Sequence, residues 1–195
     1  IKFDAVAIGP GMTAGEETAK FVRDFVARCE KPMLIDADGI NAFGGLYGEL
    51  RLLSKDRSMI LSPHTGELKR LTNITVPEQP DERADALRKL VVDSEITLVH
   101  KGAPTVIAHP GGRLDVNVHG HSGQATAGSG DVLTGAIAGM LAQGAEPGEA
   151  ARVGVFVHSR AAEIAAELTG ERGMIAGDCS DSLPMAIREL EELTP

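Results

Sequence analysis

The sequence predicts an α/β fold in which a mainly parallel β-sheet is covered by helices on both faces. Short apolar runs typical of buried strands alternate along the chain with segments of helical periodicity. Glycine and proline residues gather at the ends of the apolar runs, where the functional loops of α/β proteins begin. The 195 residues, 43% hydrophobic and 24% charged, suffice for one globular domain with a sizeable core, so we expect a single domain over 1–195.

The N-terminal half is predicted to contain three strands and three helices. The first apolar run, DAVAIG, is typical of a buried strand, and the segment after it has a helical pattern. The segment PDERADALRKLVVDS has the spacing of an amphipathic helix. We expect strands at 4–9, 32–38 and 58–63, and helices at 13–29, 65–72 and 80–94.

The C-terminal half is predicted to begin with a strand and a hairpin and to end in three helices. The segment 104–118 alternates apolar and polar residues around the turn PGGR, which indicates the hairpin. Residues 173–187 are expected to form a loop leading into the last helix, with Ser180 or Asp181 as the cap. The remaining strand is expected at 96–102 and the helices at 130–143, 147–168 and 181–193.

The composition argues against several classes of function. The formal net charge is −9 without a dense Lys/Arg patch, which disfavours binding to nucleic acid or to an anionic membrane. Aromatic residues make up 3% and Trp is absent, which disfavours base-stacking platforms. No apolar run approaches the ~20 residues of a membrane span. Cys29 and Cys179 are expected to be reduced thiols of a cytosolic protein, with a disulfide as the alternative.

The stretch GQATAGSGDVLTGAIAGML, residues 123–141, places glycines and one carboxylate directly before a helical run. Glycines at a helix N-terminus allow backbone N–H groups to converge on an anion such as phosphate, and the helix dipole adds positive potential. Asp131 would lie beside the phosphate, where it could accept a proton from a hydroxyl being phosphorylated. The alternative is that Asp131 only complements the helix dipole. No Walker Gly-Lys-Ser/Thr follows these glycines.

Two further loops carry residues suited to ligand contact. In HKGAPTVIAHPGG, Lys101 ends a predicted strand and could hold a nucleotide phosphate, although a surface lysine is the simpler interpretation. In LSPHTGELKRL, either His64 or Thr65 could cap a helix, with Glu67 as the partner in a capping box. His64 also follows the C-terminal end of a strand, where ligands bind in α/β proteins.

The segment LIDADGIN places carboxylates directly after a predicted buried strand. Asp36 and Asp38, with Asn41 nearby, could hold a hydrated Mg²⁺ or substrate hydroxyl groups. An Asx turn followed by a helix cap at Asp38 is the alternative.

The remaining signals are weaker. AIGPGMTAG resembles a dinucleotide fingerprint only superficially, because the spacing fails at Ala14, but it could form a close-approach loop under a ligand. His119 and His121 lack a third ligand for zinc and are expected to be exposed, with a chance of substrate contact. His158 lies within a predicted helix and is expected to serve packing or an interface.

Taken together, the motifs resemble one family. IGPGM, LIDADGIN, LSPHTGELKRL, VHKGAPTVIAHPGG, GSGDVLTGAIAGMLAQG and GDCSDSLP occur in the order found in the NAD(P)H-hydrate dehydratases, the carbohydrate-kinase-like family also called the YjeF C-terminal domain. The resemblance runs from about Asp4 to the end of the chain. GSGDVLTG alone is shared with ribokinase-like kinases, whereas its combination with SPHTGE and KGAPT is more specific.

The resemblance implies a ribokinase-like three-layer sandwich and a metabolite repair reaction. Members of the family dehydrate the S form of hydrated NADH or NADPH and consume a nucleotide. A phosphoryl group passes to the ring hydroxyl, and phosphate then leaves. For this chain the resemblance implies ADP, or else ATP, as the donor, together with Mg²⁺, a cytoplasmic location and a homotetramer.

The resemblance also implies roles for individual residues. Asp131 matches the family's base, and the amides of Gly128, Ser129 and Gly130 match its anion hole. Gly11 and His64 match positions that contact the hydrated dinucleotide, and Asp36, Asn41 and Asp131 complete the expected substrate-binding set. The expected nucleotide-binding residues are Lys101, Gly102, Ala103, Pro104, Thr105 and Gly130. No metal ligand is assigned.

One departure from the family pattern affects these expectations. Family members carry additional chain before DAVAIGPG, so we expect this domain to be truncated at its N-terminus, to expose a sheet edge and to be inactive as a lone monomer. Two other functions stay open: a kinase for a vitamin precursor such as hydroxymethylpyrimidine or hydroxyethylthiazole, and a non-catalytic nucleotide-binding subunit.

Overall fold

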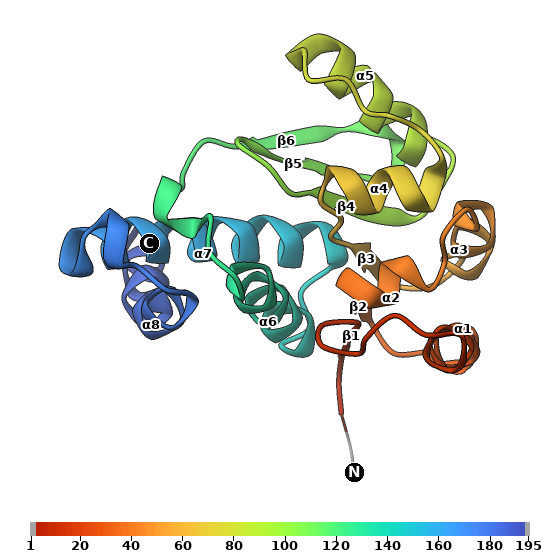
Figure 1. Ribbon diagram of the computed structural model, residues 1–195, viewed down its shortest axis with the longest axis horizontal. Helices are drawn as coiled ribbons and strands as arrows, with labels where there is room; N and C mark the ends of the chain where they lie inside the picture. The colour runs from red at the N-terminus through yellow and green to blue at the C-terminus, as the bar shows by residue number, and fades with distance from the viewer. Residues whose placement is uncertain (1–2, 194–195) are drawn as a thin grey trace.

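A six-stranded sheet with helices on both faces forms the centre of the protein (Figure 1). The computed structural model describes residues 3–193. The strand order is β1-β2-β3-β4-β5-β6; the first four strands are parallel, and β5 and β6 pair antiparallel. This confirms the expected mainly parallel α/β fold. The strands are β1 (Val6–Ile8), β2 (Met33–Ile35), β3 (Met59–Leu61), β4 (Ile96–His100), β5 (Thr105–Ala108) and β6 (Leu114–Asn117).

Alternate residues of the central strands supply two separate cores. In β2, Met33 and Ile35 join the core under the helices of the N-terminal half, whereas Leu34 joins the core under α6 and α7. All three are fully or almost fully buried, as expected for strands covered on both faces. The helices are α1 (Glu16–Arg28), α2 (Ala37–Asn41), α3 (Tyr47–Leu53), α4 (Thr65–Thr72), α5 (Pro80–Val91), α6 (Ser129–Ala142), α7 (Pro147–Thr169) and α8 (Ala176–Leu193).

The predicted hairpin is confirmed. Strands β5 and β6 pair from Thr105↔Asn117 to Ala108↔Leu114. Their connection contains a short 3₁₀ turn, η1 (Pro110–Gly112), in which Gly111 and Gly112 have φ of 78° and 88°. Glycine adopts these left-handed angles without steric cost, which explains the Gly-Gly pair at the turn.

The last helix begins earlier than the sequence predicted. Helix α8 starts at Ala176, so Ser180 and Asp181 lie inside it and neither is its cap. Instead, Asp178 accepts a hydrogen bond from the Ile175 N–H at 2.8 Å. Small polar residues and Pro184 are typical of loops, but Cys179 is buried in the core shared with α7, and this packing favours the helix.

Helices α2 and α3 were not predicted, because they have only five and seven residues and lack side-chain caps. Asp38 lies in the first turn of α2 and is not its cap.

The thiols of Cys29 and Cys179 are both free. Within residues 3–193, no helix has the length and apolar character needed to cross a membrane.

Helices α6 and α7 approach each other closely at Gly154. A Cβ atom there would lie 2.6 Å from Ile137 Cγ1 and 2.8 Å from Ile137 Cα. We therefore expect Gly154→Ala to force the helices apart and to lower the free energy of unfolding by about 1–3 kcal/mol, measured by urea denaturation. Gly135→Ala is the matched control, because a Cβ there meets nothing within 4 Å and alanine favours a helix by up to about 1 kcal/mol. Equal effects of the two substitutions would contradict this packing.

Candidate functional site

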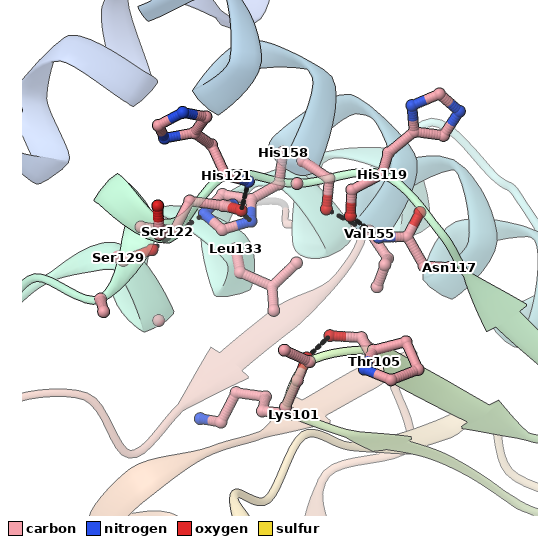
Figure 2. Close-up of a pocket in the computed structure, with 18 of the residues that line it drawn as sticks. Lys101, Thr105, Asn117, His119, His121, Ser122, Ser129, Leu133, Val155 and His158 are labelled. Carbon is pink, nitrogen blue, oxygen red and sulfur yellow. Dashed lines mark hydrogen bonds between the residues drawn. The ribbon is translucent and has the colours of Figure 1, made fainter. Parts of the chain in front are cut away.

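A cavity of about 830 Å³ lies between the segment after β4 and the N-terminal end of α6. Lys101, Gly102, Ala103, Pro104 and Thr105 line one wall, and Ser129, Gly130 and His158 are among the residues of the facing wall. Figure 2 shows Lys101 and Thr105 across the cavity from Ser129 and His158. The structure thus brings the predicted nucleotide-binding segment together with most of the predicted anion hole. The volume lies in the usual range for small-molecule sites.

The glycine turn before α6 presents free backbone donors. Gly128 has φ of 87° and is the N-cap residue of α6. The Ser129 amide donates to the Thr126 carbonyl at 3.3 Å, and the Asp131 amide donates to the Gly128 carbonyl at 3.0 Å. In the part of the chain that the structure describes, the amides of Gly128 and Gly130 have no protein acceptor. Two of the three predicted anion-hole amides are therefore free at the positive end of a helix dipole.

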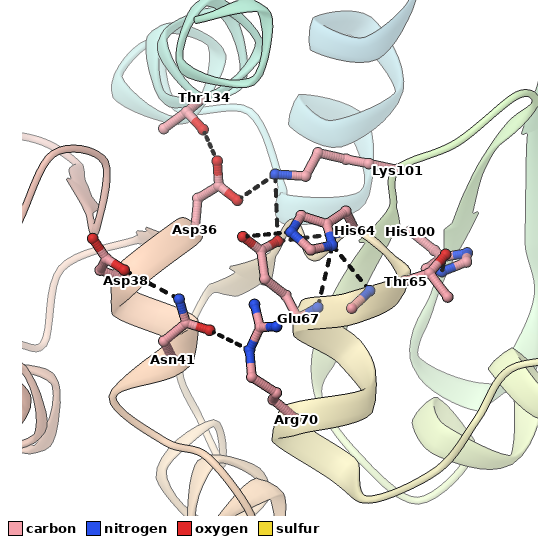
Figure 3. Close-up of polar contacts among 11 residues, drawn as sticks. Asp36, Asp38, Asn41, His64, Thr65, Glu67, Arg70, His100, Lys101 and Thr134 are labelled. Carbon is pink, nitrogen blue, oxygen red and sulfur yellow. Dashed lines mark hydrogen bonds and ion pairs between the residues drawn. The ribbon is translucent and has the colours of Figure 1, made fainter. Parts of the chain in front are cut away.

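A buried ion pair connects the ends of two strands to α6 (Figure 3). The Lys101 Nζ lies 2.7 Å from Asp36 Oδ1 and 3.7 Å from Glu67 Oε2. Thr134, on α6, donates from its hydroxyl to the other oxygen of Asp36 at 2.7 Å. Asp36 is 1% exposed, so its charge is compensated by protein groups rather than by water.

This ion pair changes the expected roles of two residues. The Lys101 ammonium group lies 3.7 Å from the position that a Cβ would take at Gly130, so it adds positive charge beside the glycine turn. Asp36 does not line the cavity, and both its oxygens have protein partners. The structure therefore gives Asp36 the position of a residue that orients Lys101, and direct contact of Asp36 with substrate stays a prediction.

The predicted capping box of α4 is confirmed, with His64 as the cap. The Nδ1 atom of His64 accepts from the amides of Gly66 and Glu67 at 2.9 and 3.2 Å, and Glu67 Oε2 accepts from the His64 N–H at 2.8 Å. The ring also lines the cavity, and its side chain is 51% exposed. His64 thus caps a helix and also faces the site.

Arg83, which also contacts His100, supports the predicted nucleotide-binding segment through the Pro104 carbonyl. Arg83 Nη2 donates to the Pro104 carbonyl at 2.9 Å and lies 3.0 Å from His100 Nδ1, and His100 Nε2 lies 3.3 Å from the Thr65 hydroxyl. Burial, and secondarily the charge of Arg83, lowers the pKa of His100 to about 4. The neutral ring can therefore accept from Arg83 while it donates to Thr65.

His158 was expected to be a packing residue, and the structure places it both in the interior and against the cavity. It is 6% exposed, and burial lowers its pKa to about 4. Sequence reasoning missed several other cavity residues, among them Asn117, Gln124 and Ser159, which are ordinary polar residues with no local motif. His119 is exposed as expected, whereas His121 is only half-exposed, and both line the cavity.

Besides Asp36, four predicted site residues lie outside the cavity lining. Asp131 is exposed in the first turn of α6. Asn41 bridges Asp38 and Arg70 through bonds of 3.1 and 2.9 Å. Gly11 has φ of 71°, and a Cβ there would meet nothing within 4 Å. The close approach of this loop to a ligand stays a prediction; within the protein, the loop packs tightly at Gly9, where a Cβ would lie 1.8 Å from the Asp36 carbonyl oxygen. Gly128 is the fourth residue outside the lining.

The residues that the structure describes contain no group of three or more His, Cys, Asp or Glu side chains arranged to hold a metal ion.

The sequence matches a family model described as NAD(P)H-hydrate dehydratase over residues 1–185. It is 42% identical over 190 residues to a bifunctional NAD(P)H-hydrate repair enzyme of Moorella thermoacetica, which covers 97% of this chain and 35% of that protein. It is 36% identical over 178 residues to an ADP-dependent (S)-NAD(P)H-hydrate dehydratase of Neisseria meningitidis, which covers 90% of this chain and 60% of the relative. The chain thus spans about a third of the Moorella relative's length.

Solved structures show the same fold. An ADP/ATP-dependent NAD(P)H-hydrate dehydratase from Bacillus subtilis, co-crystallised with ATP/Mg²⁺, superposes with a TM-score of 0.78 at 31% identity, over 95% of this chain and 64% of that one. A hydroxyethylthiazole kinase from Pyrococcus horikoshii superposes with a TM-score of 0.66 at 21% identity, over 92% of this chain and 70% of that one. The second likeness concerns the fold alone.

The two buried histidines predict how stability depends on pH. Above pH 6.5, His100 and His158 are neutral in both the folded and the unfolded chain. Between pH 6.5 and about 4, only the unfolded chain takes up these protons. The free energy of unfolding should therefore decrease as the pH is lowered, by about 1.4 kcal/mol per pH unit for each ring. Urea denaturation between pH 7 and pH 4.5 measures this slope.

The matched variants for this measurement are His100→Gln and His119→Gln. His100→Gln should reduce the slope, because the ring that titrates only in the unfolded chain is gone. His119→Gln changes an exposed side chain, and the slope for this variant should equal that of the wild-type protein. Identical slopes for His100→Gln and the wild-type protein would show that His100 does not titrate in this way.

Proposed function

This chain belongs to the NAD(P)H-hydrate dehydratase family, and from this premise we propose that it carries the ADP-dependent dehydration of (S)-NAD(P)H-hydrate to NAD(P)H. The juxtaposition of two elements across one cavity carries the proposal: the glycine turn of α6, with free amides at Gly128 and Gly130, and the segment Lys101–Thr105. An anion-binding turn that faces a nucleotide-sized cavity suits transfer of a phosphoryl group. The names of the Neisseria and Bacillus relatives support ADP, or else ATP, as the donor.

The nucleotide fits the residues of the 101–105 wall. Lys101 supplies a positive charge that its carboxylate partners hold in place, and Gly102 and Ala103 expose backbone groups next to it. Arg83 fixes the Pro104 carbonyl from the opposite side. We therefore assign Lys101, Gly102, Ala103, Pro104, Thr105 and Gly130 to nucleotide binding, with the phosphates toward the α6 turn.

The chemistry explains why a dehydration consumes a nucleotide. Hydroxide is a poor leaving group, whereas phosphate is a good one. The hydroxyl oxygen of the hydrated ring attacks the terminal phosphorus of ADP, the bond to the bridging oxygen breaks, and AMP leaves. Phosphate then departs from the ring with its bonding electrons, a ring proton is lost, and the double bond is restored. The balanced products from ADP are NAD(P)H, AMP, phosphate and a proton.

The residues of the chain promote these reaction steps by their position and their charge. Asp131, exposed in the first turn of α6, takes the hydroxyl proton as oxygen attacks phosphorus. The Gly128 and Gly130 amides and the Lys101 ammonium group stabilise the charge on the transferring phosphoryl group. The Ser129 amide, which donates to the Thr126 carbonyl at 3.3 Å, belongs to the same proposed anion hole. Gly11, His64 and Asn41 contact the dinucleotide, and Asp36 acts through Lys101.

Three finer statements belong to the same proposal. Mg²⁺ binds with the nucleotide phosphates and neutralises their charge, which is its usual mode in phosphoryl transfer. The protein is a cytoplasmic homotetramer. Exposed apolar side chains support assembly: Val116 on edge strand β6 and Val118 beyond it are 54% and 85% exposed.

Hydrated NADH provides the test of this function. The protein should restore the absorbance band of reduced nicotinamide when ADP, or else ATP, is present. Absence of recovery with either nucleotide would refute the proposal. A phosphorylated vitamin precursor accumulating as a stable product would favour a kinase instead. Nucleotide binding without any turnover would favour a non-catalytic subunit.

Two substitutions should separate chemistry from nucleotide binding. Asp131→Asn removes the base but keeps the shape, so kcat should fall by about 10²-fold or more while nucleotide binding persists. Lys101→Ala should instead raise KM for the nucleotide, because it removes a positive charge beside the phosphate site. Steady-state kinetics and calorimetric titration with ADP measure the two effects.

Each substitution has a matched control in helix α5. Asp81→Asn removes an exposed first-turn carboxylate that does not line the cavity, and Lys89→Ala removes an exposed lysine that does not line it either. Both should keep wild-type kinetics. If Asp131→Asn behaves like Asp81→Asn, then Asp131 only complements the helix dipole.

A further inference from the structure

We propose that His158 is a positioning residue that fixes the anion-binding turn at the start of α6 by donating a hydrogen bond to Ser129. This inference rests on the proposed function, because it assigns a support to the same turn. His158 lies on α7, 29 positions from Ser129 in the sequence, and its Nε2 atom is 3.4 Å from the Ser129 hydroxyl oxygen. Both residues line the cavity, as Figure 2 shows.

A chain of hydrogen bonds determines which ring nitrogen of His158 carries the proton. The backbone N–H of His121 can only donate, and it lies 3.1 Å from Gln124 Oε1, so this atom is the acceptor. The amide nitrogen of Gln124 therefore faces His158 Nδ1, at 3.1 Å, and donates to it. Nδ1 must then lack a proton, which leaves the N–H at Nε2, directed at Ser129.

The ring acts as a neutral donor. It is 6% exposed on α7, and its burial keeps the imidazole uncharged at neutral pH, since the pKa of His158 is lowered to about 4. His158 therefore adds no net charge to the phosphate site. Its contribution is to hold the position of Ser129, between the two glycines whose amides are free.

The turn needs such a support because its own sequence is flexible. Gly128 and Gly130 have no side chains that could pack, and Gly128 adopts φ of 87°. The backbone of His158 is itself held from the other side, where the Cys179 thiol of α8 lies 3.5 Å from the His158 carbonyl oxygen. His158 thus connects the turn to the packed core of α7 and α8, and a small displacement of an anion hole is costly to catalysis.

A pair of isosteric substitutions separates this role from mere packing. The terminal amide nitrogen of glutamine occupies about the position of Nε2 and can donate to Ser129, whereas the amide of asparagine reaches only the position of Nδ1. With hydrated NADH and ADP as substrates, His158→Asn should lower kcat about tenfold, the equivalent of one lost hydrogen bond of about 1.4 kcal/mol. His158→Gln should keep a kcat several-fold above that of His158→Asn. KM for ADP should change little in either.

Ser129→Ala provides the second measurement. If His158 acts through the Ser129 hydroxyl, Ser129→Ala should by itself lower kcat several-fold, and adding His158→Asn to it should cause little further loss. This single variant also decides the matter if His158→Asn does not fold, which thermal unfolding would reveal. Full kcat in Ser129→Ala would overturn the inference.

The possible failures are distinguishable. A wild-type protein that restores no NADH with ADP or ATP refutes the proposed function, and the inference falls with it. An active wild-type protein in which the asparagine and glutamine variants lose kcat equally, in step with their thermal stability, overturns the inference alone. A role in packing only predicts that kcat follows thermal stability in every variant, whether or not a donor occupies the position of Nε2.

Discussion

The buried ion pair between Lys101 and Asp36 is the interaction on which the rest of the site depends. It joins the residue after β4 to the residue after β2, and Thr134 adds α6 to the same cluster. A buried carboxylate without its partner carries a large desolvation penalty, so the loss of Lys101 would destabilise this cluster. The ends of β2 and β4, the segment 101–105 and helix α6 are held in one arrangement as a result.

The proposed phosphate site of an acidic protein requires a local positive potential. The chain has a formal net charge of −9, and the site obtains its potential from free amides at Gly128 and Gly130, the dipole of α6 and one lysine. His100 and His158 lie beside these groups as neutral donors and acceptors. Backbone N–H groups are well suited to stabilising the charge of a transferred phosphoryl group, because they need no counter-ion and little reorganisation.

Sequence reasoning succeeded where a local pattern has one physical outcome. The apolar runs became strands, the Gly-Gly turn became a hairpin, and His64 with Glu67 became a capping box. It failed at the start of α8, where the last helix was expected to begin only near Asp181, because burial of Cys179 against α7 outweighs local preference. It also could not identify Gln124 or His158 as site residues, since their partners are distant in the sequence.

By itself, the sequence determined the class of fold, the glycine turn before a helix and the set of motifs that places the chain in its family. These properties depend on residues that are near one another in the chain, so composition and spacing are enough. Only the tertiary structure decided that Asp36 forms an ion pair with Lys101 and that His158 faces Ser129. Thr134 and Asp36 are 98 positions apart, and pairing across such a distance is set by the packing of α6 on the sheet, which no local pattern encodes.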